Sequence, residues 1–202
     1  MAQKFTDKLL FIILLFFSAV FIFPVFIVLI NSFKIKFSIA SAPFNLPTTD
    51  TFSGFSNYIE GIKNTGFPSA FGWSLFITVF SVLAIIIFTS MTAWYITRVK
   101  GLLNSLIYYA FVFSMIVPFQ MVMFTMSKTA NVLMLDNPFG IILIYTGFGA
   151  GLSVFMFTGF IKSVPLGIEE AATIDGCNAL QVFWKVVFPI LKPTSITVAI
   201  LN

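Results

Sequence analysis

Charged residues are scarce in this sequence, and histidine is absent. Only 9% of the 202 residues are charged, whereas 59% are hydrophobic and 28 are phenylalanine. Water-soluble domains are about one-quarter charged, so this composition excludes an ordinary soluble protein. It is typical instead of a chain that lies within a lipid bilayer.

The lack of histidine and the single cysteine, Cys177, restrict the chemistry of the chain. An internal disulfide needs two cysteines, and zinc sites and Ser-His-Asp triads need histidine or several cysteines. We therefore expect a non-catalytic chain that binds no metal or cofactor. The net charge of +4 is spread over scattered basic residues rather than gathered in a run, so we expect no nucleic-acid partner.

Long apolar runs, separated by more polar segments, are what the sequence does contain. An α-helix rises about 1.5 Å per residue, so roughly 20 apolar residues cross a bilayer. Four complete runs and the start of a fifth fit this pattern, at about 9–30, 71–96, 102–126, 139–161 and 193–202. We therefore predict an all-α, polytopic transmembrane helical bundle that forms a single domain over residues 1–202. Because the fifth run is too short to cross, we also expect a chain truncated at its C-terminus.

The first run has a second interpretation as a secretory signal, because Ala40-Ser41-Ala42 resembles a cleavage site. The run is too long for a signal core, and Lys34 and Lys36 intervene, so we expect an uncleaved anchor. The polar segment that follows, up to about Ala70, is rich in proline and glycine. We expect an extramembrane loop there, with a short helix around Phe55–Ile62.

The distribution of basic residues favours a cytoplasmic N-terminus. In that orientation the cytoplasmic segments hold more lysine and arginine than the outer ones, as membrane proteins prefer. The cytoplasmic set is Lys4, Lys8, Arg98, Lys100, Lys162, Lys185 and Lys192, and the outer set is Lys34, Lys36, Lys63 and Lys128. This orientation places the loop 162–192 in the cytoplasm.

The loop 162–192 has the signals of two short helices that meet at a corner. Ser163 and Pro165 are typical of a helix start, and Gly176 is typical of a helix end. Asn178 with Gln181 three residues later predicts a capping box for the second helix. In that helix an apolar stripe with helical spacing is predicted to pack against the membrane domain, formed by Leu180, Phe183, Trp184, Val187 and Phe188.

The same loop carries a longer motif. Glu170-Ala171-Ala172 is followed by Asp175-Gly176 and, after nine intervening residues, by Val186-Val187-Phe188-Pro189. This spacing resembles the EAA signature of the permease subunits of ABC importers, with valine and phenylalanine replacing the usual isoleucine and leucine of its last part. Asp175, Pro193, the long loop after the first run and the Val117–Gln120 sequence resemble the carbohydrate-importing, maltose-type second-permease branch. The alternative interpretation is that Glu-Ala-Ala is present only because these residues favour an α-helix.

The resemblance implies a six-helix permease whose EAA loop forms a cytoplasmic coupling helix. It implies that this helix docks on a dimer of ABC ATPases, which would bind and use ATP and Mg²⁺. A second permease, an extracytoplasmic solute-binding protein and the lipid bilayer of a bacterial inner membrane would complete the system. The coupling residues would be Glu170, Ala171, Ala172, Asp175, Gly176 and Pro189.

Two absences agree with an external energy source. The four complete runs contain no ionisable Asp, Glu, Lys, Arg or His that could relay protons, and the chain has no Gly-x-x-x-x-Gly-Lys-[Ser/Thr] phosphate loop. The expected function is thus that of a permease subunit of an ATP-driven, binding-protein-dependent sugar importer that works by alternating access. An ABC permease for a non-sugar solute, a passive channel or scaffold, and an inactive fragment remain alternatives.

Two membrane features have open interpretations. Pro118 is expected to kink the run 102–126, and Gln120 beside it either faces a translocation path or hydrogen-bonds between helices. Gly147, Gly149 and Gly151 in the run 139–161 are expected to allow close helix packing, and Gly147 with Gly151 forms a Gly-x-x-x-Gly pattern; a pore lining is the alternative.

Overall fold

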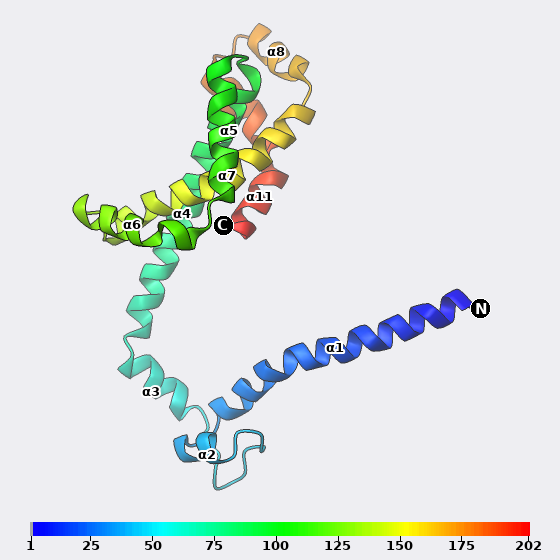
Figure 1. Cartoon of the computed structure of the whole chain (residues 1–202), viewed down its shortest axis with the longest axis vertical. Coiled ribbons are helices and arrows are strands. Elements are labelled where there is room, and N and C mark those ends of the chain that lie inside the picture. The colour runs from blue at the N-terminus through cyan, green and yellow to red at the C-terminus, as the bar shows by residue number, and fades with distance from the viewer. Residues whose placement is uncertain (1) are drawn as a thin grey trace. The chain divides into compact units, whose positions relative to one another are not determined.

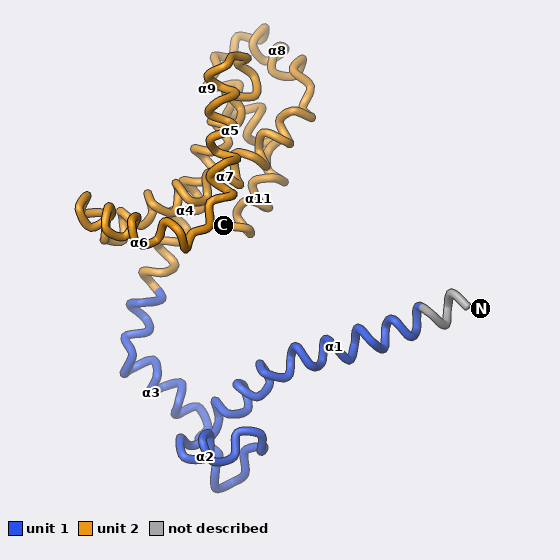
Figure 2. Tube along the Cα trace, in the orientation of Figure 1, with its two compact units in different colours: residues 1–71 blue, residues 72–202 orange. Residues whose placement is uncertain are grey.

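The computed structural model describes the backbone of residues 2–202 and the side chains of residues 7–202. Across these residues the chain consists of helices joined by turns and one longer loop, without a β-strand, so the predicted all-α class is confirmed. Its contacts divide it into two compact units, Met1–Phe71 and Gly72–Asn202, where we expected one domain (Figure 2). The division falls within a helix, α4 (Phe67–Arg98).

Unit 1 starts with a long helix, α1 (Ala2–Ser32), that contains the predicted run 9–30 (Figure 1). Pro24 lies inside α1 without ending it, as membrane helices tolerate. Within unit 1, the most apolar stretch of α1 is not buried. A helix of this length and composition is suited to lipid rather than to water.

Two short helices follow in the loop of unit 1, α2 (Lys36–Ser41) and α3 (Ser56–Asn64). α3 confirms the helix expected around Phe55–Ile62, whereas no signal in the sequence indicates α2. The loop is therefore more ordered than its proline and glycine content suggests.

Lys34 organises this loop. Its side chain is only 1% exposed, although its sequence context is that of an ordinary basic loop residue. The ammonium group donates to the backbone oxygen of Ala42 at 2.9 Å and to Oδ1 of Asn31 at 3.0 Å. Asn57 Nδ2 in turn donates to the Lys34 backbone oxygen at 2.7 Å, which ties α3 to the end of α1. We call this arrangement the Lys34 cage.

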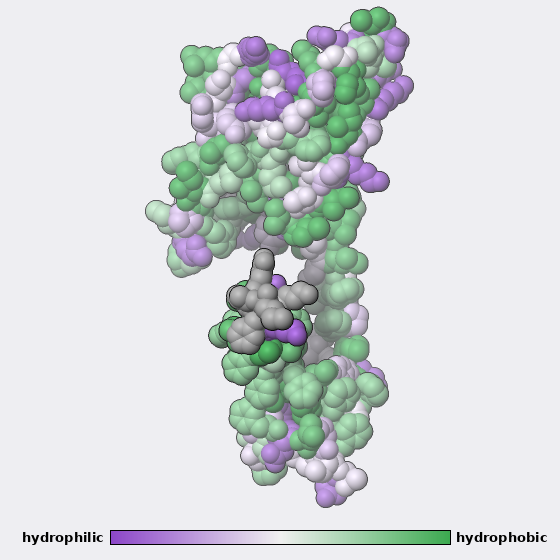
Figure 3. All heavy atoms as spheres, turned by 90° about the vertical axis from the view of Figure 1, so that its right-hand side faces the viewer, coloured by the Kyte–Doolittle hydropathy of each residue, from purple (hydrophilic) through white to green (hydrophobic). Residues whose placement is uncertain are grey.

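Unit 2 is a helical bundle with a small apolar core. Besides most of α4, its main helices are α5 (Leu102–Ile116), α6 (Phe119–Val132), α7 (Pro138–Ser163) and α11 (Lys192–Leu201). The core side chains come from α4, α7 and the C-terminal segment: Ile85, Ala93, Val154, Phe157, Ile161, Val182, Phe183, Val187, Leu191 and Val198. Much of the surface of the unit is also apolar, as expected of a membrane protein (Figure 3).

The run 102–126, expected to be one kinked helix, is instead two helices. α5 and α6 meet at 105°, with Val117 and Pro118 between them in extended conformation. Proline lacks an N–H and disfavours the helical conformation of the preceding residue, so two consecutive residues leave the helix and the chain turns sharply. The stretches Ala179–Ile190 and Lys192–Leu201 meet at 72°, with Leu191 between them in right-handed helical conformation.

The number of membrane crossings depends on how these bent pairs are counted. In the described chain, three helices are long and apolar enough to cross a membrane, Asp7–Ser32, Phe67–Arg98 and Pro138–Ser163. The number rises to five if each bent pair is one span. The predicted number of spans, four complete ones and the start of a fifth, therefore remains a prediction.

Glycines allow α7 to approach its neighbours closely. A Cβ at Gly151 would lie 2.8 Å from the backbone oxygen of Phe111 in α5, and one at Gly149 would lie 2.6 Å from Cδ1 of Ile85 in α4. A Cβ at Gly147 would meet nothing within 4 Å. The packing pair is thus Gly149 and Gly151, and the expectation for Gly147 is wrong because this residue faces away from the contacts.

Candidate functional site

The segment with the longest sequence motif begins with a short helix, α8 (Leu166–Ile174), directly after α7 (Figure 1). Val164 and Pro165 are extended and separate the two helices. Ser163 does not cap α8, contrary to expectation. It belongs to the last turn of α7, where its hydroxyl donates to the backbone oxygen of Phe160 at 2.7 Å.

The end of α8 is formed as the sequence predicts. Gly176 has a φ of +90°, a left-handed conformation that glycine adopts without steric cost. Gly176 N donates to the Thr173 oxygen and Cys177 N donates to the Ala172 oxygen, each at 3.0 Å, which is the Schellman pattern of a helix end. The predicted stop at Gly176 is therefore confirmed.

The second helix starts with the predicted capping box. Gln181 N donates to Oδ1 of Asn178 at 3.0 Å, and Asn178 N donates to Oε1 of Gln181 at 2.9 Å. The helix has three parts: α9 (Ala179–Val182), a π-helical turn η1 (Phe183–Val187) and α10 (Phe188–Ile190). The corner between two short helices is thus confirmed.

The predicted apolar stripe on the second helix is only partly correct. Phe183 and Val187 are buried, whereas Leu180 is 60% and Trp184 is 43% exposed. The π-helical turn adds one residue to the repeat, because the Phe188 N–H donates to the Phe183 oxygen five residues before it. Pro189 follows this turn and has no N–H to donate, so a regular α-helical ladder cannot continue there.

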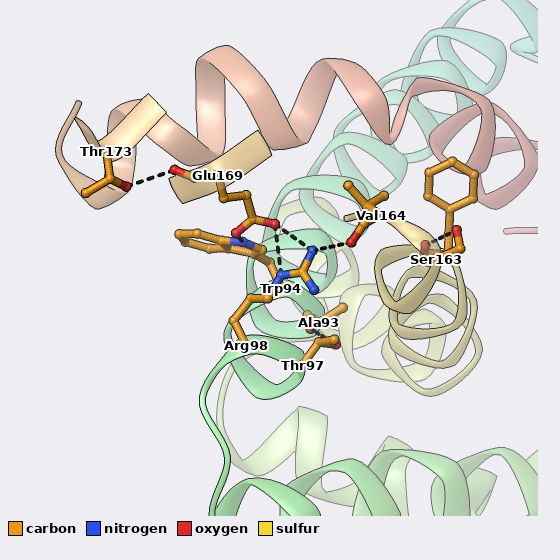
Figure 4. Close-up of polar contacts among 9 residues, drawn as sticks. Ala93, Trp94, Thr97, Arg98, Ser163, Val164, Glu169 and Thr173 are labelled. Carbon is orange, nitrogen blue, oxygen red and sulfur yellow. Dashed lines mark hydrogen bonds and ion pairs between the residues drawn. The ribbon is translucent and has the colours of Figure 1, made fainter. Parts of the chain in front are cut away.

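A buried ion pair holds α8 against the bundle (Figure 4). Arg98, at the end of α4, donates from Nε to Oε1 of Glu169 at 2.8 Å, and its Nη2 forms an ion pair with the same oxygen at 2.7 Å. Trp94 Nε1 donates to the other carboxylate oxygen, Oε2, at 2.8 Å. Arg98 Nη2 also donates to the Val164 backbone oxygen at 3.0 Å, at the junction of α7 and α8. We call these contacts the Glu169 clamp.

The clamp satisfies groups that would otherwise be costly to bury. Glu169 is only 6% exposed, and both of its oxygens accept charge-assisted or indole hydrogen bonds. Buried charges are stable only when they are paired and hydrogen-bonded, so the position of α8 depends on the two α4 side chains. The sequence motif identified Glu170 as a coupling residue and did not identify Glu169. The signals for Glu169 that the sequence contains are a second glutamate adjacent to Glu170, a basic residue at Arg98 and a tryptophan near the membrane interface at Trp94.

The clamp leaves the opposite face of α8 exposed. Glu170, Ala171, Asp175 and Gly176 are exposed, and Ala172 is half-buried. Ile174 is 85% exposed. Beside α8 lies an open pocket of about 600 Å³, with Trp94, Glu169, Glu170, Ile174 and Val182 in its wall.

Two predicted residues lie apart from this group. Pro189 is exposed on α10, beyond the π-helical turn, and is not in the pocket wall. Gln120 is exposed in the first turn of α6, and α6 and α8 lie at opposite ends of unit 2 (Figure 1). Within the described residues, no group of His, Cys, Asp and Glu could hold a metal ion.

Comparison with known proteins identifies a family and several relatives of this chain. Residues 85–202 match the family described as binding-protein-dependent transport system inner membrane component, which confirms the resemblance seen in the motif. Over 92% of its length, the chain is 38% identical to the probable starch degradation products transport system permease protein AmyC of Thermoanaerobacterium thermosulfurigenes. Over 89% of its length, it is 33% identical to the melibiose/raffinose/stachyose import permease protein MelC of Bacillus subtilis.

A solved structure shares the fold. All of the chain superposes, with a TM-score of 0.83 and 24% identity, on a bacterial ABC transporter involved in the import of the acidic polysaccharide alginate. The chain covers 70% of that structure's chain. It spans 66% of the length of AmyC and 64% of the length of MelC.

Proposed function

This chain belongs to the family of binding-protein-dependent transport system inner membrane components, and from this premise we propose that it is the membrane-spanning permease subunit of an ATP-driven sugar importer. The sugar assignment is supported by relatives whose names state import of starch degradation products or of melibiose, raffinose and stachyose. The chain is an inner-membrane protein by its family and its apolar helices.

We infer that the energy and the substrate reach this subunit through partners. A dimer of cytoplasmic ATPases would bind and hydrolyse ATP with Mg²⁺, and an extracytoplasmic binding protein would deliver the sugar. A second permease would complete the translocation path. This chain performs no bond chemistry in the proposal, which agrees with its lack of histidine and of a phosphate-loop sequence.

The Glu169 clamp is the observation that supports a coupling role for α8. A helix that transmits force has to be joined firmly to the helices that it moves. Arg98 and Trp94 join α8 to the last turns of α4, and the Val164 carbonyl joins the same guanidinium to the end of α7. A displacement of α8 would therefore be passed to α4 and α7 together.

The exposed face of α8 is suited to a protein partner. Ile174 offers apolar area, and the small side chain of Ala171 permits a close approach of two backbones. Glu170 and Asp175 supply charges at the edge of this face, where they set the orientation of a partner. With the N-terminus in the cytoplasm, as the basic residues favour, this face meets the cytoplasmic ATPase.

Co-purification tests the proposal. The permease, expressed with its partner ATPase, is captured from detergent, and the retained ATPase is quantified for wild type and for Ile174→Asp. We expect the variant to lose most of the ATPase, since a carboxylate would be buried without a partner. Leu133→Asp is the matched control, because Leu133 is also exposed but lies in the turn after α6, at the other end of unit 2.

The outcomes separate the alternatives. Wild type that never retains an ATPase would show a passive channel or scaffold and overturn the proposal. Equal loss in both variants would attribute the effect to the added charge rather than to α8. Uptake of labelled oligosaccharides by reconstituted vesicles tests the substrate class, and ATP-dependent uptake of a different solute instead would refute the sugar assignment alone.

A further inference from the structure

A second pocket of unit 2 lies at the junction of α4, α5 and α7, and neither the motif nor the Glu169 clamp uses it. It has a volume of about 270 Å³. Its wall contains Lys100 from the α4–α5 turn and Lys162 from the last turn of α7. Three hydroxyl-bearing side chains from α5 also line it, Ser105, Tyr108 and Tyr109, and none of the lining residues is acidic. We call it the Lys100/Lys162 pocket.

The start of α5 adds positive potential to this pocket. The first N–H groups of a helix have no partner within the helix, and the helix dipole makes this end attractive to anions. The residue that caps α5 is Gly101, which has no side chain that could accept hydrogen bonds from these groups. Asn104 Nδ2 donates to the Val99 oxygen at 2.6 Å and so holds the turn that carries Lys100 in place.

One buried hydroxyl in the pocket wall has no partner. Thr158 of α7 is 3% exposed, and its Oγ1 makes no hydrogen bond with any residue that the structure describes. Lys162 lies one turn further along α7, with its Nζ 5.4 Å from the centre of the Tyr108 ring. A buried polar atom without a partner costs free energy, so the hydroxyl points to a ligand with acceptor oxygens.

The surroundings of the pocket identify the kind of ligand. The same first turns of α5 carry strongly exposed apolar side chains, with Leu102 at 79%, Leu103 at 70% and Leu106 at 56%. A basic pocket that continues into an apolar helix face matches a molecule with an anionic head and hydrocarbon chains. Hydrophilic residues gather at the end of unit 2 that carries α8, above a largely apolar body, as expected where a membrane surface lies (Figure 3).

We propose that the Lys100/Lys162 pocket binds the phosphate group of an anionic phospholipid. The two ammonium groups and the first amides of α5 meet the phosphate oxygens, Thr158 Oγ1 donates to one of them, and the acyl chains lie along α5. The site is in the inner leaflet if the proposed orientation holds. An acidic segment of a partner protein is the rival occupant, and it would show no preference among lipids.

Native mass spectrometry of the full chain tests this. The protein in detergent is titrated with an equimolar mixture of phosphatidylglycerol and phosphatidylcholine that have identical acyl chains. We expect the anionic lipid to be retained about tenfold more strongly. Each lysine near an anionic lipid is worth about a fivefold change, so the double variant Lys100→Gln/Lys162→Gln should lose roughly thirtyfold in affinity for it. Lys128→Gln, which removes an exposed lysine on α6, should retain the preference.

A separate arm distinguishes a lipid from a free anion. Inorganic phosphate and glycerol phosphate are added as competitors at the same concentrations. Displacement of the lipid by either one at equal concentration would show a simple anion pocket and overturn the lipid assignment. Failure of both to compete at that concentration supports it, because the acyl chains on α5 then contribute to binding.

Thr158→Val keeps the test decisive if the double variant does not fold. The substitution preserves shape and removes only the unpartnered hydroxyl, so the melting temperature without lipid should stay equal or rise. The affinity for phosphatidylglycerol should fall roughly fivefold, and Thr158→Ser should restore it. An unchanged affinity for phosphatidylglycerol in Thr158→Val, or a loss in Lys128→Gln equal to that of the double variant, would overturn the proposal.

Discussion

Each unit of this protein holds a basic side chain near the end of its long helix, but the two side chains differ in how far away in the sequence their hydrogen-bond partners lie. In unit 1, Lys34 binds an amide oxygen and a backbone carbonyl that are only three and eight residues away. In unit 2, Arg98 binds Glu169 and the Val164 carbonyl, which are 71 and 66 residues away. The Lys34 cage thus orders one loop, whereas the Glu169 clamp joins three helices.

The chemistry of the acceptors agrees with this division. The atoms around the Lys34 ammonium group are neutral oxygens, which suffice to keep a local loop in shape. The clamp has a carboxylate, and its charge-assisted hydrogen bonds are stronger and directional. A long-range connection that has to transmit motion benefits from such bonds, while a loop does not require them.

Removal of Glu169 should reduce the free energy of unfolding more than any other substitution in the two units considered below. Glu169→Ala leaves the Arg98 guanidinium only its bond to the Val164 oxygen and leaves the Trp94 N–H without its acceptor, so we expect a loss of about 3 kcal/mol in the free energy of unfolding. Denaturant unfolding in mild detergent measures this. Glu170→Ala is the matched control, because Glu170 is the adjacent glutamate and is exposed, and it should unfold like wild type. Equal destabilisation by both variants would refute a special role of Glu169.

The packing of unit 2 is the next feature to disrupt. Gly151→Ala places a Cβ 2.8 Å from the Phe111 backbone oxygen, and overpacking of this kind costs about 2 kcal/mol. Gly147→Ala, on the same helix with open space around it, should be neutral or slightly stabilising. Thermal melts of the two variants test this, and similar melting temperatures would contradict the contact between α5 and α7.

A smaller and local effect is expected in unit 1. Lys34→Met removes the donor of the cage and leaves the Ala42 oxygen without it, at a cost of about 1–2 kcal/mol. Hydrogen–deuterium exchange should rise across residues 31–57 and stay unchanged in unit 2. Lys36→Met is the control, since Lys36 is exposed. Faster exchange in α8 or α4 of the Lys34 variant would show that the cage is not local.

The smallest effect is expected at the corner after α8. Gly176→Ala forces a Cβ into the left-handed conformation at a φ of +90° and should cost about 1 kcal/mol. Gly176→Asn should cost less, because asparagine tolerates this conformation better. The melting temperatures of the two variants give the ranking, and a reversed order would contradict the observed turn.

Much of the fold follows from short stretches of sequence. The apolar runs predict the long helices, Pro118 predicts an interruption, and Gly176 with the Asn178–Gln181 pair predicts the corner after α8. These features depend on backbone hydrogen bonds and hydropathy within a few residues, which is information that a sequence pattern contains. The family resemblance likewise comes from the spacing of a contiguous motif.

Other features were decided only by tertiary structure. Adjacent glutamates are equivalent in a helix pattern, and Glu169 rather than Glu170 is buried because Arg98 and Trp94 lie on that side of α8. The π-helical turn changed which side chains of the second helix are buried, and the α5–α6 angle of 105° replaced the expected kink. The burial of Lys34 also required the folded loop. In each case the deciding contact or direction depends on how segments pack in space, and local patterns do not encode it.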